Sequence, residues 1–445
     1  MQSKLSLSLD YYEESLKLDK KLRLELNYKI QISIGKIYLR LGELEKSVEL
    51  FTELLQNHTT TEDKKTILSY LAIIYNIRGE YSKAKQLMEQ LYDAGSPFVG
   101  YDFILHQSYL GLNMLDEAEK VENIAQIKVE NTKIPTNVKY LKRMIAERNY
   151  HIGNLFVAKQ KFEEILDISI NDKQLNWIFK SYSEIIKIQL DLFQLQPSNQ
   201  TLKNELFSLI NTLQQLTDDQ GMIVASIETS LIGADLLISE NLLEDAEIRT
   251  NKALQLAKEY DYSNLIEKTL TKLDIIKQIK YGKTGTKEQN EGIFSRIKQA
   301  ATNLLRIQPT GNLKEQQVDV HGIIIIGEGG INIFDYYFDT KLSSEPSLIS
   351  GLISAVSSFM GEISRGNGYL KSIGHDDMNL ILEPIGELLL VCIASDETFD
   401  LRDKTRRFAD KMKTLIGKEN DVSARISNEL INNLNNITEQ VYITK

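Results

Sequence analysis

Apolar residues recur at intervals near 3.6 positions from about Tyr11 to Ile279, and this single feature restricts that part of the chain to packed helices. Strand-like alternation is absent there. Glycine and proline mark the predicted breaks, which are Gly79, the run 95–97, Gly111, Pro135, Gly153 and Pro197. The spacing therefore predicts an array of antiparallel helices.

One pattern of side chains returns along these helices. A small residue is followed by tyrosine, glycine, a second small residue and a large apolar residue. Counted each time from the preceding residue of the pattern, the intervals are three, four, five and four positions. Small residues let two helices approach closely, and the glycine or asparagine serves the turn between them, where a positive φ can be required. Copies of the pattern start at Gly35, Ala72, His106, Ala146 and Ala234. The third copy is weaker, because Glu122 stands where a large apolar residue belongs.

The segments IRGEYSKAKQLMEQL and LRLGELEKSVELFTELL closely resemble the tetratricopeptide repeat (TPR). The resemblance is strong over about Asn27–Leu91, fair to about Leu166 and weak from there to Lys280. It implies that residues 1–280 form a superhelix whose concave groove, lined by the first helix of each repeat, binds a peptide or a helix. A generic α-solenoid or helical bundle is the alternative.

Eight residues are expected to line that groove: Lys36, Ile73, Asn76, Phe103, Gln107, Arg143, Glu147 and Tyr150. They do not form the clamp with which some TPR proteins hold a C-terminal carboxylate. A groove of this composition suits an amphipathic segment better. The open alternative is that the groove holds the chain's own C-terminal part.

Two polar joints, residues 281–290 and 310–317, lie on either side of a predicted helix at 292–308, and together they form the linker 281–317. On a helical wheel the apolar side chains of this helix, including Phe294, Ile297 and Leu304, fill one side, and basic and polar residues fill the other. We expect this apolar side to be buried against the rest of the chain. Binding to a membrane surface or to a partner is the alternative.

The pattern changes at Val318, and residues 318–445 contain short β-rich runs and helices in the order β-β-α-β-β-β-α-α. The expected strands are 322–326, 331–338, 369–373, 378–382 and 387–394, with turns at 327–330, 374–377 and 384–386, and the expected helices are 347–363, 399–416 and about 422–442. A five-stranded antiparallel sheet with helices packed on it is the natural two-layer solution. The predicted fold class is an all-α solenoid followed by an α+β domain.

This order, with the segments GIIIIGEGGINIFDYYFD, PSLISGLISAVSSFMGEI and NLILEPIGELLLVCIA, resembles the longin domain and its roadblock relatives. The helix at 292–308 is more like roadblock, so the choice between the two stays open, and an unrelated α+β domain is the alternative. The resemblance implies a platform that pairs with itself or with a similar domain, and through that pairing with a small GTPase. Small residues on the helix 347–363 would let a second helix approach; they are Ser350, Ser354, Ser357 and Gly361.

No motif indicates catalysis, a cofactor or a metal. Gly282-Lys283-Thr284 lacks the upstream glycine of a phosphate-binding loop, the five histidines are scattered, and Cys392 lies in an apolar run without an identifiable base. A net charge of −10 disfavours nucleic acid as a partner. A single cysteine excludes an internal disulfide, and the lack of a signal peptide or a spanning-length apolar run favours a cytoplasmic location.

We therefore expect a non-catalytic scaffold or adaptor that is cytoplasmic or peripheral to a membrane. Its groove would bind a protein segment, and its C-terminal domain would pair with a similar domain or a small GTPase in traffic-type regulation. The alternative is a peptide-binding TPR protein of the chaperone or assembly type whose C-terminal domain only dimerises it. An enzyme of unrecognised type is the remaining possibility.

Overall fold

The computed structural model describes most of the chain. The described residues are 9–15, 17, 27–41, 43–56, 61–91, 98–260, 262–280, 287–307, 309, 311–327, 331–338, 372–375, 378–385, 388–416 and 428–443. Contacts divide the chain into unit 1, which is Met1–Leu192 with Thr302–Asn312, and unit 2, which is Phe193–Ala301 with Leu313–Lys445. The domain boundaries expected at residues 280 and 317 stay predictions.

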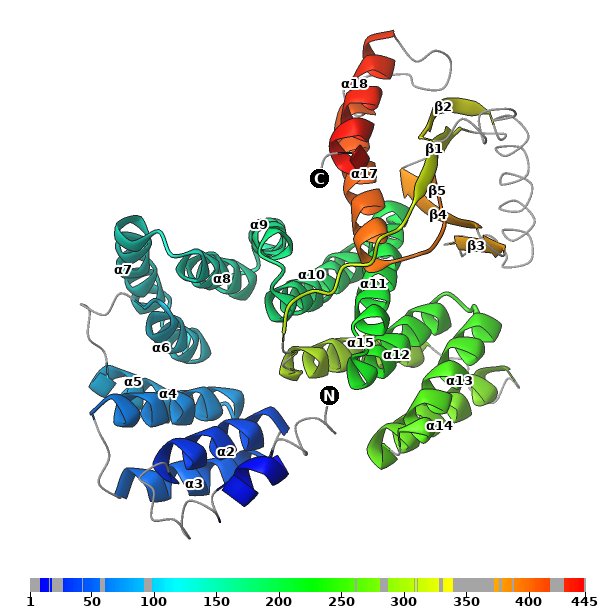
Figure 1. Ribbon diagram of the computed structural model, residues 1–445. Coiled ribbons are helices and arrows are strands. Elements are labelled where there is room, and N and C mark those ends of the chain that lie inside the picture. The colour runs from blue at the N-terminus through cyan, green and yellow to red at the C-terminus, as the bar shows by residue number, and fades with distance from the viewer. Residues whose placement is uncertain are drawn as a thin grey trace. The chain divides into compact units, whose positions relative to one another are not determined.

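Unit 1 is a series of antiparallel helix pairs, α2/α3, α4/α5, α6/α7 and α8/α9, followed by most of α10 (Figure 1). The bounds are α2 Asn27–Leu41, α3 Leu44–Gln56, α4 Thr61–Ile77, α5 Tyr81–Leu91, α6 Gly100–Gly111, α7 Leu115–Thr132, α8 Pro135–His151, α9 Leu155–Asn171 and α10 Leu175–Leu195. The helical period read from the sequence is confirmed, and the chain is mostly a helical repeat solenoid.

The turns within the repeats have the backbone that the pattern requires. Gly79, Asn113, Gly153 and Asn241 occupy the turn position of four repeats, with φ of 76°, 57°, 83° and 59°. Glycine adopts this left-handed region without steric cost, and asparagine tolerates it better than most residues. The glycine of the first repeat, Gly42, lies outside the described residues.

Close approach of paired helices is clearest between α2 and α3. A Cβ atom added at Gly35 would lie 2.6 Å from the ring of Phe51, which is fully buried. The Ser47 hydroxyl donates to the Gly35 carbonyl at 2.8 Å. Two small residues and one aromatic ring therefore fix the distance between these helices, as the repeat pattern predicts.

The first helices of the repeats form one layer of unit 1. Helix α4 packs on α6 and α6 on α8 more closely than the second helices α5, α7 and α9 pack on one another. An array whose first helices are closer together curves toward them. We call this concave side, formed by α2, α4, α6, α8 and α10, the inner face.

Unit 2 contains further helices, whose bounds are α11 Gln200–Asp219, α12 Ile223–Ser239, α13 Leu243–Glu259, α14 Ser263–Lys280 and α15 Lys287–Arg306. Helix α15 belongs to unit 2 as far as Ala301, and its last turn is assigned to unit 1. Helix α15 confirms the helix expected at 292–308, with Ile297 and Leu304 fully buried, whereas the side chain of Phe294 lies outside the described residues. Residues 287–290 were expected in a polar joint but are helical, because lysine, glutamate and glutamine are good helix formers.

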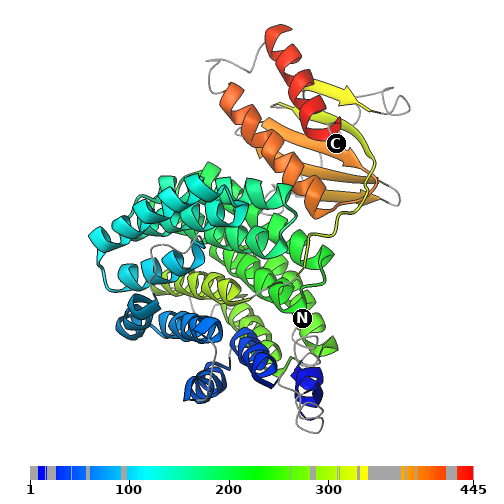
Figure 2. The same ribbon diagram turned by 60° about the vertical axis from the view of Figure 1, so that its left-hand side comes forward.

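The C-terminal part of unit 2 is a five-stranded antiparallel sheet in the order β2-β1-β5-β4-β3 (Figure 1). The strands are β1 Val320–Ile326, β2 Asn332–Tyr337, β3 Ser372–His375, β4 Met378–Ile385 and β5 Leu388–Ala394, and the helices are α17 Phe399–Ile416 and α18 Asn428–Thr438, with a π-helical turn at Glu439–Ile443. Helix α17 packs on β4 and β5, and α18 on β2, so both cover the same face (Figure 2).

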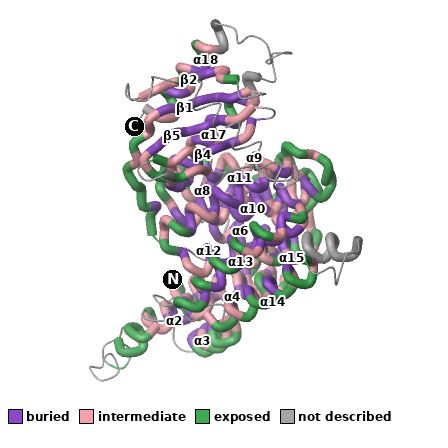
Figure 3. Tube along the Cα trace, turned by 90° about the vertical axis from the view of Figure 1, so that its right-hand side faces the viewer, coloured by how far each residue is buried: buried purple, intermediate pink, exposed green. Residues whose placement is uncertain are grey.

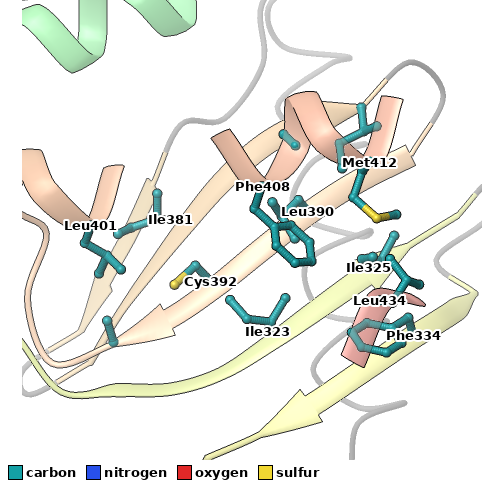
Figure 4. Close-up of a cluster of buried hydrophobic side chains, with 13 residues drawn as sticks. Ile323, Ile325, Phe334, Ile381, Leu390, Cys392, Leu401, Phe408, Met412 and Leu434 are labelled. Carbon is teal, nitrogen blue, oxygen red and sulfur yellow. The ribbon is translucent and has the colours of Figure 1, made fainter. Parts of the chain in front are cut away.

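Both faces of the sheet are apolar. Ile323 and Ile325 of β1 belong to the cluster beneath α17 and α18, which also contains Phe408 and Leu434 (Figure 4). Their neighbour Ile324 belongs to a separate buried cluster on the opposite face. Figure 3 shows the resulting buried stretches along the central strands. Burial on both sides explains why this segment is a continuous apolar run rather than an alternating one.

Two turns are shorter than expected. His375 pairs with Met378, and Ile385 pairs with Leu388, so both hairpins close over two residues. Pro384 therefore lies within a strand rather than in a turn, opposite Leu389. The ladder prevails there because the paired segments bury apolar side chains. The expected helix 347–363 lies outside the described residues, and so do its predicted interface residues Ser350, Ser354, Ser357 and Gly361.

Candidate functional site

The inner face of unit 1 carries the residues that the sequence assigned to a groove. An aromatic row runs across it, from Phe103 on α6 to Tyr140 on α8 and Trp177 on α10. The ring centroids of Phe103 and Tyr140 are 5.3 Å apart, and those of Tyr140 and Trp177 are 5.1 Å apart. Phe98 lies 5.8 Å from Tyr140, edge-on. Tyr140 and Trp177 are half-buried, so each presents part of its ring to the surface.

Phe103 and Asn76 make contacts between successive first helices, and Asn76 is half-buried. Phe103 is only 7% exposed and lies in the buried cluster between the helices, with the Arg143 guanidinium 4.8 Å from its ring centroid. The Asn76 amide donates to the Ile104 carbonyl at 3.0 Å and accepts from the Ser108 hydroxyl at 2.9 Å. Both side chains are occupied in holding successive first helices together. Their assignment to the groove stays a prediction.

A chain of polar contacts lies beside the aromatic row. Arg143 donates to Glu147 at 2.7 Å and approaches Glu184 of α10 at 3.9 Å. Gln107 of α6 donates to Glu147 at 3.4 Å. Burial opposes the charge of Arg143, but Glu147 and Glu184 outweigh it and raise the pKa of the guanidinium. These contacts link three successive first helices through residues that the sequence had singled out.

Tyr150 closes the polar chain at the far end of α8. Its hydroxyl donates to Asp191 at 2.5 Å, and the Lys187 ammonium lies 4.3 Å from the centroid of its ring. Burial, followed by the interaction with Asp191, raises the pKa of the phenol. Lys187 also approaches Glu184 at 3.5 Å. Tyr150 is therefore a protonated hydrogen-bond donor at neutral pH.

The remaining two expected groove residues lie toward the N-terminus. Lys36 on α2 lies 5.0 Å above the ring centroid of Tyr70 on α4. Ile73 is half-buried and packs against the cluster shared by α4 to α8.

Lys180 on α10 is the residue that the sequence analysis missed. It is half-buried, and among the described residues it has no hydrogen bond or ion pair, unlike Arg143 and Lys187 on either side. Burial, with a further contribution from Arg143, lowers the pKa of its ammonium to about 7. A signal was present: a step of 37 residues leads from Arg143 to Lys180 and from Glu147 to Glu184, the same interval that separates Ser47 from Ala84 in the repeats.

The described residues contain no group of three or more His, Cys, Asp or Glu side chains placed to hold a metal ion. Burial raises the pKa of the Cys392 thiol to about 12, so this thiol is protonated in its strand at neutral pH. Within the same described ranges, none of the helices combines the length and the apolarity that crossing a bilayer would take.

No protein-family model matches the chain, and neither does any curated protein. Similarity to solved structures is low. A STAND signal-transduction ATPase with a TPR sensor from Pyrococcus horikoshii is 15% identical over 67% of this chain and 48% of that one, with a TM-score of 0.44. This chain thus spans about half the length of that protein.

Two further structures are similar at the same level. A Rap protein complexed with competence and sporulation factor is 13% identical, over 62% of this chain and 86% of that one, with a TM-score of 0.36. The quorum sensor NprR from B. thuringiensis is 14% identical, over 69% and 90%, with a TM-score of 0.38. At this level of similarity none of the three structures carries a conclusion about function.

Proposed function

We propose that this chain is a non-catalytic protein-interaction protein, and that the inner face of unit 1 binds a segment of a partner protein. The observation that carries the proposal is Lys180, an ammonium without a partner among the described residues, set beside an aromatic row and within a line of satisfied ion pairs. A half-buried polar group normally has a partner, because leaving it without one costs free energy. A bound carboxylate would supply the missing interaction.

The neighbouring residues define the rest of the bound segment. Tyr140 and Trp177 offer half-buried aromatic surface, on which apolar side chains of the segment would pack. Gln107 and Glu147 hydrogen-bond to each other beside this surface and fix its polar margin. The fitting partner is thus a segment with an acidic residue, or a chain end, next to apolar side chains.

Binding of a carboxylate to Lys180 is linked to protons. The pKa of the free ammonium is lowered to about 7, so only part of the population is charged at neutral pH. A carboxylate partner favours the charged form, and binding therefore takes up protons near neutrality. The affinity is expected to fall as the pH rises above about 7.

The experiment is site-specific photo-crosslinking in the native cell. A photoreactive residue at position 177 is expected to capture a protein that the same residue at position 156 does not, since Phe156 is 67% exposed on the second helix α9. Lys180→Glu should abolish that adduct, whereas Lys161→Glu on α9 should leave it unchanged. Equal adducts from positions 177 and 156, or an adduct that survives Lys180→Glu, would refute the proposal.

The C-terminal sheet supports a second proposed role as a pairing platform of the longin or roadblock type. The five described strands and the two helices after them occur in the order of that resemblance, whereas the helix expected at 347–363 lies outside the described residues. Strands β2 and β3 are the ends of the described sheet. An edge strand can add a strand from another chain. We propose pairing with a second copy or a similar domain, and through it with a small GTPase; the alternative is that the domain only dimerises a peptide-binding protein.

This second role needs a test on a sample that includes α11. The Ser208 hydroxyl of α11 donates to the buried Glu383 of β4, and Asp219 of α11 accepts from the Phe399 N–H of α17. A fragment that begins near residue 317 would lose both contacts. Two measurements on the full chain test this role. The mass in solution shows whether the chain pairs with a second copy, and nucleotide-release assays on small GTPases encoded by the same organism show whether it acts on them. A monomer that changes no release rate would leave the peptide-binding role alone.

The cellular location belongs to the same proposal. We propose a cytoplasmic protein. The membrane-surface alternative depended on an exposed apolar side of the helix at 292–308, and Ile297 and Leu304 of α15 are fully buried. That burial favours docking of α15 within the chain.

A further inference from the structure

A cavity of about 260 Å³ lies between the second helices α5 and α7 of unit 1, on the side away from the inner face. Both helices pack on α6 but not closely on each other. An array that curves toward its first helices spreads its second helices apart, and the gap then reaches down to the first helix between them. We call this gap the outer cavity. All of its lining residues belong to unit 1.

Part of the lining of the outer cavity is apolar. Leu105 of α6 and Val121 of α7 are buried, and Ile124 of α7 is half-buried. A hydrocarbon chain placed on this surface would displace water from it, which is favourable. Long charged side chains lay their alkyl stems along such surfaces while the charged end stays in a polar environment. The apolar part of the lining therefore suits the stem of a long side chain.

The rest of the lining places two carboxylates near a phenol. The Tyr109 hydroxyl of α6 donates to Glu89 of α5 at 3.3 Å, and its oxygen can still accept a hydrogen bond. Burial, then Glu89 and then Glu117 of α7 raise the pKa of Tyr109, so the phenol is protonated at neutral pH. Glu117 is half-buried, and in the described part of the chain its side chain has no hydrogen bond and no ion pair.

The lysines around the outer cavity leave Glu117 without a cation. Lys85 lies 3.7 Å from Glu89 and 5.9 Å from the ring centroid of Tyr109, so Glu89 already has a positive neighbour. Lys120 lines the cavity but is exposed, and it forms no ion pair among the described residues. A further positive charge beside Glu117 would gain an ion pair with the carboxylate and an interaction with the Tyr109 ring.

We infer that the outer cavity binds the side chain of a lysine or arginine from a partner protein, with the cation beside Glu117 and the alkyl stem on the apolar part of the lining. The net charge of −10 also attracts a basic segment to this chain. The site lies on second helices and prefers a cation, whereas the inner face is proposed to bind a carboxylate at Lys180. It does not depend on that role.

The test is protection of a thiol from chemical modification in the full-length chain. Lys120→Cys places a thiol at the outer cavity, and the native Cys392 is fully buried, so methyl methanethiosulfonate is expected to modify position 120 alone. N-acetylarginine methylamide, which is charged only at its guanidinium, should slow this reaction. Its uncharged analogue N-acetylnorleucine methylamide should not. Glu117→Gln in the same background should weaken binding of the arginine probe about fivefold, as expected for a half-exposed ion pair. Glu130→Gln, exposed on the same helix, is the matched control.

A second measurement keeps the native lining. In a chain with ring-¹³C-labelled tyrosine, the Tyr109 resonance is identified by its absence from Tyr109→Phe. The arginine probe should shift this resonance in the wild type and in Lys180→Glu, but not in Glu117→Gln. The inference is overturned if the wild-type resonance does not shift, if the norleucine probe protects the thiol equally, or if Glu117→Gln binds the arginine probe as the wild type does. None of these outcomes changes the crosslinking result expected at position 177.

Discussion

His106 and Glu122 face each other in the interior of the third repeat, with Nε2 of His106 2.9 Å from Oε1 of Glu122. The histidine is fully buried and the carboxylate side chain 7% exposed. Arg148 from α8 adds two hydrogen bonds to the same carboxylate, at 2.8 and 3.0 Å. Other repeats have a small residue and a large apolar residue at these two positions. The third repeat fits the pattern poorly because it has instead a histidine and a glutamate that hydrogen-bond to each other.

The pair predicts strong coupling between two substitutions. Glu122→Leu alone leaves His106 and Arg148 without their acceptor and should destabilise the fold by about 2–4 kcal/mol. His106→Ala combined with Glu122→Leu restores the composition of the other repeats and should recover part of that loss, with a coupling of roughly 1–2 kcal/mol. Urea unfolding of the two single variants and the double variant measures it. Strict additivity would contradict the compensation.

Glu122 also predicts a pH dependence. Burial opposes its charge, but the hydrogen bonds from His106 and Arg148 outweigh burial and lower its pKa below the ordinary value of 4.5. A carboxyl group whose pKa is lowered by folding stabilises the folded state at pH values above its ordinary pKa. This contribution is lost as the pH falls through the pKa that the group has in the folded state. Acid unfolding of Glu122→Gln should therefore be less steep than that of the wild type. Glu130→Gln, at an exposed position on the same helix, should not change the profile.

Gly35→Ala separates close packing from helix propensity. In an open helix this substitution would stabilise by about 1 kcal/mol. The added Cβ at Gly35 would instead lie 2.6 Å from the Phe51 ring, and we expect a loss of about 1–3 kcal/mol. Thermal and urea unfolding give the sign. Phe51→Leu in the Gly35→Ala background should remove part of the clash, and a stabilised Gly35→Ala variant would disprove the packing argument.

Glu383 predicts the opposite pH behaviour. Burial raises the pKa of this carboxyl in β4, against the hydrogen bond from Ser208. A carboxyl group whose pKa is raised by folding favours the folded state at pH values below its ordinary pKa. That stability is lost as the pH rises through the pKa that the group has in the folded state. Glu383→Gln keeps an acceptor for Ser208 and should flatten the decline in stability between mildly acidic and neutral pH. Glu244→Gln, which is exposed on α13, serves as the control.

Asp219 predicts a local effect on α17. Its carboxylate accepts the Phe399 N–H at 2.7 Å, at the first residue of that helix. Asp219→Ala removes an acceptor from a helix start and should cost about 0.5–2 kcal/mol. Hydrogen exchange should accelerate in the first turn of α17 and remain unchanged in α18. Uniform acceleration over the whole sheet would indicate a different role for Asp219.

The sequence predicted those features that depend on neighbours along the chain. Helical spacing, the left-handed turn at Asn113 and the close approach at Gly35 follow from local steric requirements. These requirements can be inferred from the types of the residues at those positions. The groove residues Arg143 and Glu147 were assigned in the same way, and their role in a groove stays a prediction. Lys180 was missed because the repeat pattern is faint where α10 begins, although the 37-residue step still reaches it.

Contacts between distant parts of the chain gave no such signal. Ser208 and Glu383 are 175 residues apart, and nothing in either neighbourhood marks the other. The extent of β4 was missed for a related reason. A proline two residues before a glycine favours a turn locally, but pairing of Ile385 with Leu388 extends the ladder beyond Pro384. Pairing with a neighbouring strand determines the structure at such positions, and the turn or strand propensity of a single residue does not predict that pairing.

Helix α11 has consequences for the order in which the chain acquires its structure. Its contacts with Glu383, Glu397 and Phe399 each span 175 residues or more, whereas the helix pairs of unit 1 close over a few tens of residues. Short-range contacts form early, and long-range ones must wait for loop closure. During synthesis the repeats of unit 1 can form as they leave the ribosome. The Ser208, Gln215 and Asp219 side chains of α11 stay open to water until the residues that they contact have been made. A ribosome that stops before residue 383 releases a chain in which α11 lacks all of these contacts.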